Sequence, residues 1–475
     1  MEFIAQQPTH DLTYSDVFLV PSRSDVSSRF DVELSTSDGS GASIPLVSAN
    51  MNSVTGPRLA AAMARRGGLG VLPQDLSLEE TLAAVAWVKA QSPWWDAPFE
   101  LDEDLTVAEA LSVVPAVAGV NILTHAGLLD VGDLADAPLD STLAELTPPS
   151  RFAIDAALID HSRAAFDAID QATGSVTSAS VVEHGRIVGA LSRRSALRNT
   201  VYRPALDASG RLRVAVAIGI NADVEERASA LVAAGVDVLV IDTAHGHQAA
   251  MLRALERVAA LGLAVPLVAG NVVTTEAVRD LVGAGANILK VGVGPGAMCT
   301  TRMMTAVGRP QFSAVLECAQ AAKELGAHVW ADGGVRYPRD VALALAAGSS
   351  AVMIGSWFAG TIEAPGVVRQ DANGALFKES WGMASTKAVR ARFARLDAFE
   401  RERKELYAEG ISSSSIALDP QRPGVDDLLD LITAGLRSSL SYAGARTLSE
   451  FHERAMVGTQ SAAGYEEGKA LPVSW

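Results

Sequence analysis

Short apolar runs recur along this chain, and each has the length of a buried strand. The runs are residues 44–49, 68–72, 214–219, 236–242, 265–270, 287–292, 328–332 and 351–355. A strand that is apolar on both faces is typical of a parallel sheet that is covered on both sides. The pattern therefore predicts eight parallel strands in the interior of an α/β protein.

Amphipathic segments separate the later runs and predict helices between the strands. Residues 222–235, 274–285 and 338–348 each end in a glycine directly before the next apolar run. Glycine at this place is typical of a helix C-terminus, where the backbone turns left-handed before the chain continues. Strands that alternate with helices indicate parallel βα units, and eight such units predict a closed (β/α)₈ barrel.

The regular spacing breaks once, after the second strand. A helix is expected at residues 77–90, because Ser77 and Glu80 have the spacing of a capping box. The next apolar run begins only at residue 214, and a segment with prolines and tryptophans opens the gap. We therefore expect an interrupted barrel, with residues 1–92 as its first part, 93–205 as an inserted domain and 206–475 as its second part.

The chain no longer follows the βα repeat after the eighth strand. Residues 384–410 are strongly charged with a helical pattern, and residues 425–455 have helical periodicity that could cover the outside of the barrel. Residues 412–415 are four consecutive serines, which we expect to form a loop.

The composition excludes several classes of protein. Apolar residues make up 49% of the 475 residues, which indicates a globular chain, and the net charge of −16 disfavours nucleic-acid binding, which needs a basic face. The N-terminus lacks the pattern of a signal peptide, and we expect no association with a membrane. Only two cysteines are present, so we expect a reducing compartment and a cytoplasmic protein.

Polar residues and glycines follow the predicted strands repeatedly. Catalytic groups of a (β/α)₈ barrel gather at the C-terminal ends of its strands. The residues at these ends are Asn50, Met51, Asn52, Asp242, Gly270, Asn271, Gly292 to Thr301, Asp332, Gly333, Gly334, Gly355 and Ser356. Because they share one end of the barrel, we expect them to surround one site.

The loop at residues 291–302 is the richest of these segments. Its glycines and proline exclude regular structure, so carbonyl and N–H groups can turn inward toward a monovalent cation or a phosphate. Cys299 on this loop has the exposure that a thiolate nucleophile needs. The alternative is a small buried apolar residue, which is what we expect of Cys318 in the helical segment 312–325.

The loops after the seventh and eighth strands suggest phosphate binding by backbone N–H groups, with ordinary turn glycines as the alternative. Asp242 is placed to accept hydrogen bonds from ribose hydroxyls, or else to cap the turn that follows its strand. His245 and His247 do not indicate a metal site, because the sequence supplies no third ligand near them.

Several segments, taken in order, resemble the IMP dehydrogenase and GMP reductase family over nearly the whole chain. They are LTYSDVFLVPSRSDV (12–26), PLVSANMNSVTG (45–56), GGLGVLPQD (67–75), GVGPGAMCTTR (292–302), VGRPQ (307–311), WADGGVR (330–336) and SYAGARTLSEF (441–451). The insert resembles a tandem CBS pair, a nucleotide-sensing module, through TVAEAL (106–111) and GRIVGALSRRSALR (185–198).

This resemblance implies roles for individual residues. Cys299 would form a covalent adduct at purine C2, and Thr301 would work with Glu409 in proton transfer. The implied nucleotide ligands are Asp332, Gly333, Gly334, Gly355, Ser356 and Met383. The implied cofactor contacts are Asp242, Gly292 and Gly294. The implied potassium ligands are the carbonyls of Gly294, Gly296 and Cys299. The resemblance also implies a homotetramer or octamer, with a purine nucleotide bound to the CBS pair.

The chain departs from the family pattern at three places. Ala297 stands where the family usually has a phosphate-binding serine, and Ala384 replaces a serine or glycine in the turn GMAS. After Glu409, residues 411–424 replace the usual stretch of proline, aromatic residue, lysine and glycine. The change at Ala297 argues against that serine's phosphate contact, and the replaced stretch 411–424 suggests that the flap of the family is rebuilt in this chain.

Three functions stay open on the sequence. A GMP reductase would use NADPH to convert GMP to IMP and ammonia, and an IMP dehydrogenase would use NAD and water to convert IMP to XMP. A catalytically inactive nucleotide-binding regulator is the third, which the retention of Cys299, Thr301 and Glu409 disfavours.

The reductase is preferred, because the dehydrogenase activates water with an Arg-Tyr pair on the flap. The nearest pairs here are Arg392-Phe393 and Arg395-Leu396, and neither contains the tyrosine. Two features favour the dehydrogenase: the segment DTAHGH (242–247) and the length of the flap. In that case Arg392 would be the base.

Overall fold

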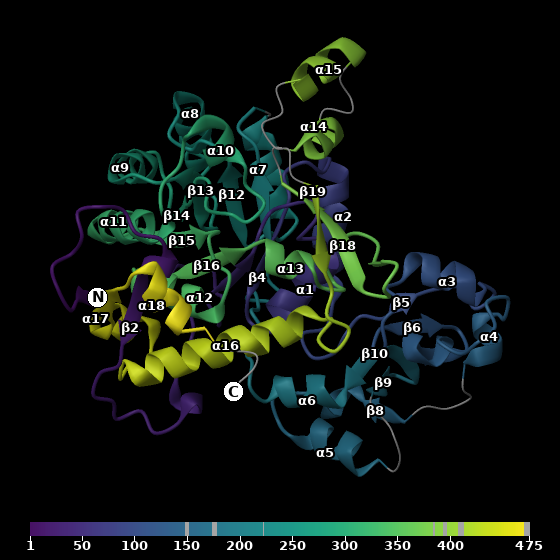
Figure 1. Cartoon of the computed structure of the whole chain (residues 1–475). Coiled ribbons are helices and arrows are strands. Elements are labelled where there is room, and N and C mark those ends of the chain that lie inside the picture. The colour runs from purple at the N-terminus through teal and green to yellow at the C-terminus, as the bar shows by residue number, and fades with distance from the viewer. Residues whose placement is uncertain are drawn as a thin grey trace.

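A closed barrel of eight parallel strands forms the centre of the molecule (Figure 1). The computed structural model describes residues 1–147, 152–172, 178–221, 223–382, 385–392, 397–406 and 413–469. The barrel strands, in the order in which they pair around the barrel, are β11 (Ala215–Ile218), β12 (Val238–Asp242), β13 (Leu267–Val272), β14 (Ile288–Val291), β15 (His328–Asp332), β16 (Ala351–Ile354), β3 (Leu46–Ser48) and β4 (Leu69–Leu72). Seven of the eight predicted runs contain one of them, and β13 begins in the run 265–270 and continues two residues beyond it, which confirms the barrel.

Helices surround the barrel and pack their apolar faces on it (Figure 1). They are α1 (Pro57–Arg65), α2 (Leu78–Ala90), α7 (Val224–Ala233), α8 (Ala249–Ala259), α9 (Thr275–Gly283), α11 (Gln311–Glu324) and α12 (Pro338–Ala346). The capping box at α2 is confirmed, since Ser77 N donates to Glu80 Oε2 (2.8 Å) and Glu80 N donates to Ser77 Oγ (3.2 Å). Gly235 and Gly285 follow α7 and α9 with φ of +96° and +114°, so the predicted helix ends are confirmed as well.

Two small units of the same topology lie between α2 and β11. The first contains β5 (Phe99–Glu100), α3 (Val107–Val113), β6 (Asn121–Thr124), β7 (Gly127–Asp130) and α4 (Leu143–Leu146). The second contains β8 (Ala153–Asp155), α5 (Ala164–Gln171), β9 (Ser178–Glu183), β10 (Arg186–Ser192) and α6 (Arg193–Asn199). In each unit the first two strands pair in parallel and the last two antiparallel. The chain therefore leaves the barrel once and repeats one fold before it returns.

A buried ionic cluster fastens the second unit to the barrel. Arg198 of α6 donates to Asp427 Oδ1 (2.6 Å) and Asp430 Oδ2 (2.7 Å) on α16 (Val425–Tyr442), the long helix below the barrel in Figure 1. Arg66, the residue directly after α1, pairs with Asp426 of α16 at 2.7 Å. A buried charge that loses its partner is costly. The pairs of Arg198 with α16 therefore hold the second unit in one orientation against the barrel.

The segment after the barrel contains a three-stranded sheet. Its strands are β17 (Arg369–Gln370), β18 (Leu376–Trp381) and β19 (Ser413–Ala417). The expectation of a loop at residues 412–415 is wrong for 413–415, because Ser414 and Ser415 pair antiparallel with Ser380 and Glu379. Serine alone does not favour a strand, and the free edge of β18 supplies the pairing that the serine run lacks by itself.

The remaining elements complete the outside of the barrel. The charged stretch forms two helices, α14 (Thr386–Arg392) and α15 (Ala398–Leu406), which project from the barrel in Figure 1. The predicted helical region 425–455 contains α16 and α17 (Leu448–Arg454). Further elements are α10 (Thr301–Thr305), α13 (Ser356–Ala359), α18 (Ala462–Glu467) and a terminal sheet of β1 (Glu2–Phe3), β2 (Val17–Val20) and β20 (Met456–Thr459). None of the helices in the described residues has the length and apolarity to cross a membrane.

Candidate active site

A cavity of about 310 Å³ lies at the C-terminal ends of the barrel strands. The predicted site residues that line it are Asp242, Gly292, Gly294, Gly296, Cys299, Thr301, Asp332, Gly333, Gly334, Gly355 and Ser356. Met383 and Glu409 lie outside the described residues. The barrel thus brings together these residues from the ends of four strands, β12, β14, β15 and β16, as parallel strands dictate.

The two cysteines differ in their surroundings. Cys299 is exposed on the loop after β14, and its Sγ lies 3.3 Å from Thr301 Oγ1. Cys318 is buried within α11, where burial raises the pKa of its thiol to about 12. Because the thiolate is the reactive form, Cys318 is inert in this fold. Cys299 is the exposed thiol, and it lines the cavity.

The catalytic loop, residues 292–301, packs against the loop after β15. A Cβ at Gly333 would meet Gly296 Cα at 3.2 Å, and the φ of Gly333 is +85°. Gly334 continues with a φ of +82°. Only glycine adopts two such conformations in sequence without strain, so this pair lets two loop backbones approach each other beside Cys299.

The loop after β16 opens directly into the short helix α13. Gly355 precedes this helix and Ser356 is its first residue. The first N–H groups of a helix have no acceptor within the helix, and they point outward at its N-terminal end. In a (β/α)₈ barrel this is a frequent position for phosphate.

Lys290, at the edge of the cavity, is a site residue that the sequence analysis missed. It belongs to the apolar run 287–292, and nothing in that run indicates that its side chain turns toward the barrel interior. Its ammonium lies 2.8 Å from Asp242 Oδ1 and 2.9 Å from Asp332 Oδ2. Asn50 Nδ2 donates to the other oxygen of Asp242 (3.0 Å).

Asp75 is a second residue that the sequence analysis missed. Arg392 of α14 donates from Nε to Asp75 Oδ1 (2.7 Å) and from Nη2 to Asp75 Oδ2 (3.3 Å), and Asn52 Nδ2 donates to Asp75 Oδ2 (3.3 Å). The Asp75 side chain is only 5% exposed, while Arg392 lines the cavity. Two N–H groups of this guanidinium are directed at one carboxylate, so this arrangement does not support Arg392 as a base.

Strand β19, which lies in the replaced stretch 411–424, contacts the loop that carries Cys299. Ser414 Oγ of β19 donates to Met298 Sδ at 3.2 Å. Its partner strand β18 contributes Ser380 to the cavity wall, and Ser380 Oγ lies 3.2 Å from Ser53 Oγ. The serine strand therefore supports the loop that carries Cys299.

His247 does not face the cavity chemistry. Its Nε2 lies 2.8 Å from Asp280 Oδ2 on α9. The imidazole of His247 is therefore bound by a neighbouring carboxylate outside the cavity, as an ion pair or a hydrogen bond.

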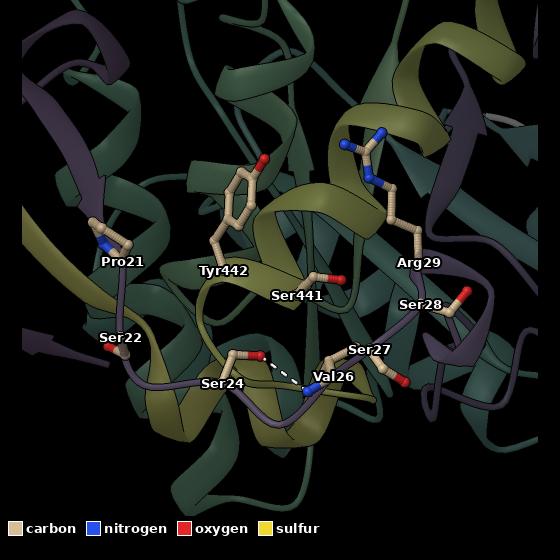
Figure 2. Close-up of a pocket in the computed structure, with 9 residues that line it drawn as sticks. All are labelled: Pro21, Ser22, Ser24, Val26, Ser27, Ser28, Arg29, Ser441 and Tyr442. Carbon is tan, nitrogen blue, oxygen red and sulfur yellow. Dashed lines mark hydrogen bonds between the residues drawn. The ribbon is translucent and has the colours of Figure 1, made fainter.

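A second cavity, of about 290 Å³, lies between the N-terminal segment and the end of α16 (Figure 2). Its lining residues are Pro21, Ser22, Ser24, Val26, Ser27, Ser28, Arg29, Ser441 and Tyr442. Figure 2 shows mostly serine hydroxyls around it, and Ser24 Oγ accepts the N–H of Val26 (3.1 Å). This lining contains neither a thiol nor a carboxylate, so we place the chemistry in the barrel cavity.

The fold and the barrel cavity define a (β/α)₈ protein with an exposed cysteine on a glycine-rich loop, beside two carboxylates and a candidate phosphate loop. A model of the IMP dehydrogenase / GMP reductase domain matches residues 11–470, and the chain belongs to this family. It is 52% identical over 473 residues to the GMP reductase of Mycobacterium tuberculosis (98% of each chain). It is 37% identical over 470 residues to the inosine-5′-monophosphate dehydrogenase of Aquifex aeolicus (96% of this chain, 94% of the relative).

A solved structure agrees with this assignment. The fold resembles the crystal structure of a cysteine-to-alanine variant of GMP reductase from Trypanosoma brucei in complex with guanosine 5′-monophosphate. The TM-score is 0.69 and the sequence identity is 32%, over 99% of each chain.

Proposed function

We propose that this protein is a GMP reductase, which converts GMP to IMP and ammonia with NADPH. The observation that carries the proposal is Cys299, exposed on its loop at a cavity that Asp332 and Ser356 line from the ends of the next two strands, β15 and β16. Relatives and a structural neighbour that bear the name GMP reductase support it.

The proposed chemistry is centred on Cys299. Its thiolate adds to purine C2, the bond from C2 to the amino group breaks, and ammonia leaves with a proton that Glu409 delivers through Thr301. The bound nicotinamide cofactor supplies the hydride. After hydride has reached C2, the C2–S bond breaks and Cys299 is returned as thiolate with IMP as product.

Other residues of the cavity would hold the nucleotide in place for this attack. The Asp332 carboxylate would accept hydrogen bonds from the ribose hydroxyls, and the N–H groups of Gly334, Gly355 and Ser356 would bind the phosphate. Met383 would contact the base. Asp242, Gly292 and Gly294 would face the cofactor.

A monovalent cation, for which we propose potassium, would be bound by the carbonyls of Gly294, Gly296 and Cys299. Neutral carbonyl oxygens suit a cation of low charge density, and Gly294 has the φ of +80° that a tight loop requires. Gly296 O accepts the N–H of Cys299 (2.9 Å) and keeps a second lone pair. The donor types therefore fit, and the ion would stiffen the loop.

The alternative is an IMP dehydrogenase, which the segment DTAHGH favours. That reaction needs a group that activates water, and Arg392 with Asp75 is a charged pair rather than a base. A spectrophotometric assay separates the two: GMP with NADPH should consume NADPH and release ammonia. Reduction of NAD by IMP with formation of XMP would reject the reductase.

We further propose that residues 93–205 form a CBS pair that binds a purine nucleotide and regulates the enzyme, and that the protein is a cytoplasmic homotetramer or octamer. The two repeated units, each with a strand, a helix, two strands and a helix, support the first part. The unpaired cysteines support the cytoplasmic location.

A further inference from the structure

Lys290 is a buried lysine at the edge of the barrel cavity. It lies on β14, and its side chain is 4% exposed. Its ammonium contacts Asp242 Oδ1 (2.8 Å) and Asp332 Oδ2 (2.9 Å), and it donates a hydrogen bond to Asn271 Oδ1. Two of these contacts, to Asn271 and Asp332, are hydrogen bonds, and the contact with Asp242 is an ion pair.

The electrostatics hold this lysine in its charged form. Burial alone would lower the pKa of Lys290, but Asp242 and Asp332 outweigh it and raise that pKa above the ordinary value for lysine. A buried lysine that keeps its proton and is surrounded by two carboxylates and an amide oxygen is held by these protein groups. Its effect must therefore pass through the groups that it contacts.

The two carboxylates that it contacts stand on different strands. Asp242 ends β12 and Asp332 ends β15, and both β13 and β14 lie between them in the barrel. Each has an amide partner of its own: Asn50 donates to Asp242 (3.0 Å), and Asn271 Nδ2 donates to Asp332 Oδ2 (2.9 Å). Lys290 is the contact that both carboxylates share.

We propose that Lys290 is a positioning residue whose ammonium holds two carboxylates in place at once. Asp242 is the carboxylate on the cofactor side, and Asp332 is the carboxylate on the nucleotide side. The assignment of the two carboxylates to two ligands rests on the proposed function. Lys290 then orients the sites for cofactor and nucleotide together, so that hydride and purine C2 are aligned by one charge.

The test compares the full-length protein with Lys290→Met. The dissociation constant of GMP, titrated calorimetrically without cofactor, and the KM for NADPH should each rise at least about tenfold, because both carboxylates lose their shared partner. Adding Asp242→Asn to this variant removes the unbalanced charge next to Asp332. The double variant should recover at least about threefold in GMP affinity without recovering the KM for NADPH.

A purely structural role predicts the opposite pattern for the double variant. If Lys290→Met only disturbs packing, the additional Asp242→Asn substitution does not restore the lost packing, so GMP affinity would stay low or fall further. That result, or a change in only one ligand with Lys290→Met, overturns the proposal.

Two further variants keep the test decisive. If Lys290→Met does not fold, Asn50→Ala retains the ammonium and removes the amide that donates to Asp242, while Asp332 keeps both Lys290 and Asn271. It should raise the KM for NADPH about three- to tenfold with the dissociation constant of GMP within about twofold, and equal changes in both would refute the proposal. Lys378→Met is the matched control: Lys378 is also buried, but it donates to the carbonyls of Thr361 and Ala364.

The control should lower the melting temperature, yet it should leave the GMP dissociation constant unchanged. The calorimetric titration with GMP, repeated with IMP, does not depend on turnover. An inactive wild-type protein with GMP and NADPH would therefore reject the proposed function and still leave the role of Lys290 measurable.

Discussion

The ion pair between Arg392 and Asp75 predicts a specific loss when it is broken. Arg392→Met removes the guanidinium and leaves the Asp75 carboxylate, whose side chain is 5% exposed, with Asn52 Nδ2 as a hydrogen-bond donor at 3.3 Å. Because α14 carries Arg392 against the loop after β4, the change should loosen α14 at the cavity wall. The chemistry at Cys299 should remain possible but less well enclosed.

The magnitude follows from the burial of the two groups. Removing one partner of a fully buried pair costs about 3–5 kcal/mol. The Arg392 side chain is 30% exposed and Asn52 still donates to Asp75, so we expect about 1.5–3 kcal/mol. If all of this free energy is lost from transition-state stabilisation, kcat/KM falls by about 10- to 160-fold.

The assay is NADPH consumption with GMP, measured for Arg392→Met, Asp75→Asn and the double variant. If the pair acts as a unit, the double variant should lose no more than the worse single variant. Arg390→Met is the control on the same helix, since Arg390 forms an exposed pair with Glu405 (2.8 Å). It should stay within about twofold of wild type.

Two results would refute this reasoning. The first is an Arg392→Met variant as active as Arg390→Met, which would mean that the pair does not support the cavity. The second is additive losses in the double variant, which would mean that the two residues act separately.

The remaining predictions concern the nucleophile, a buried carboxyl and the insert. Cys299→Ala should abolish NADPH consumption, while GMP still binds and the melting temperature is unchanged; residual turnover would reject Cys299 as the nucleophile. Cys318→Ala should keep kcat but lower the free energy of unfolding by about 1 kcal/mol, as a small core truncation does. Burial, followed by Asp426, raises the pKa of Glu363 to about 7 from 4.5. The unfolded chain then loses this proton first, so stability should fall as pH rises from about 4.5 to 7. Glu363→Gln should flatten the melting temperature over that range, and an unchanged slope would contradict the assignment. Replacing residues 93–205 by a short linker should keep basal activity and erase any response to purine nucleotides; a folded deletion without basal activity would show that the insert contributes to the site.

The sequence could predict the barrel because its signals are local. An apolar run with a glycine before it fixes a strand and the end of the preceding helix within a few residues, and Ser77 with Glu80 fixes the start of α2. The location of the candidate site follows from the same signals. Parallel strands bring their C-terminal ends to one side, so Cys299, Asp332 and Ser356 had to meet once the strands were known.

The tertiary structure alone decided which charges pair and which serines form a strand. Arg392 and Asp75 are 317 positions apart, so no local pattern links them. Lys290 stands in an apolar run, and its role depends on carboxylates that end two other strands. The run at Ser413–Ala417 becomes a strand because β18 offers it a free edge. Periodicity and capping are properties of neighbouring residues, whereas ion pairing and strand pairing depend on which distant segments the closed barrel brings within reach.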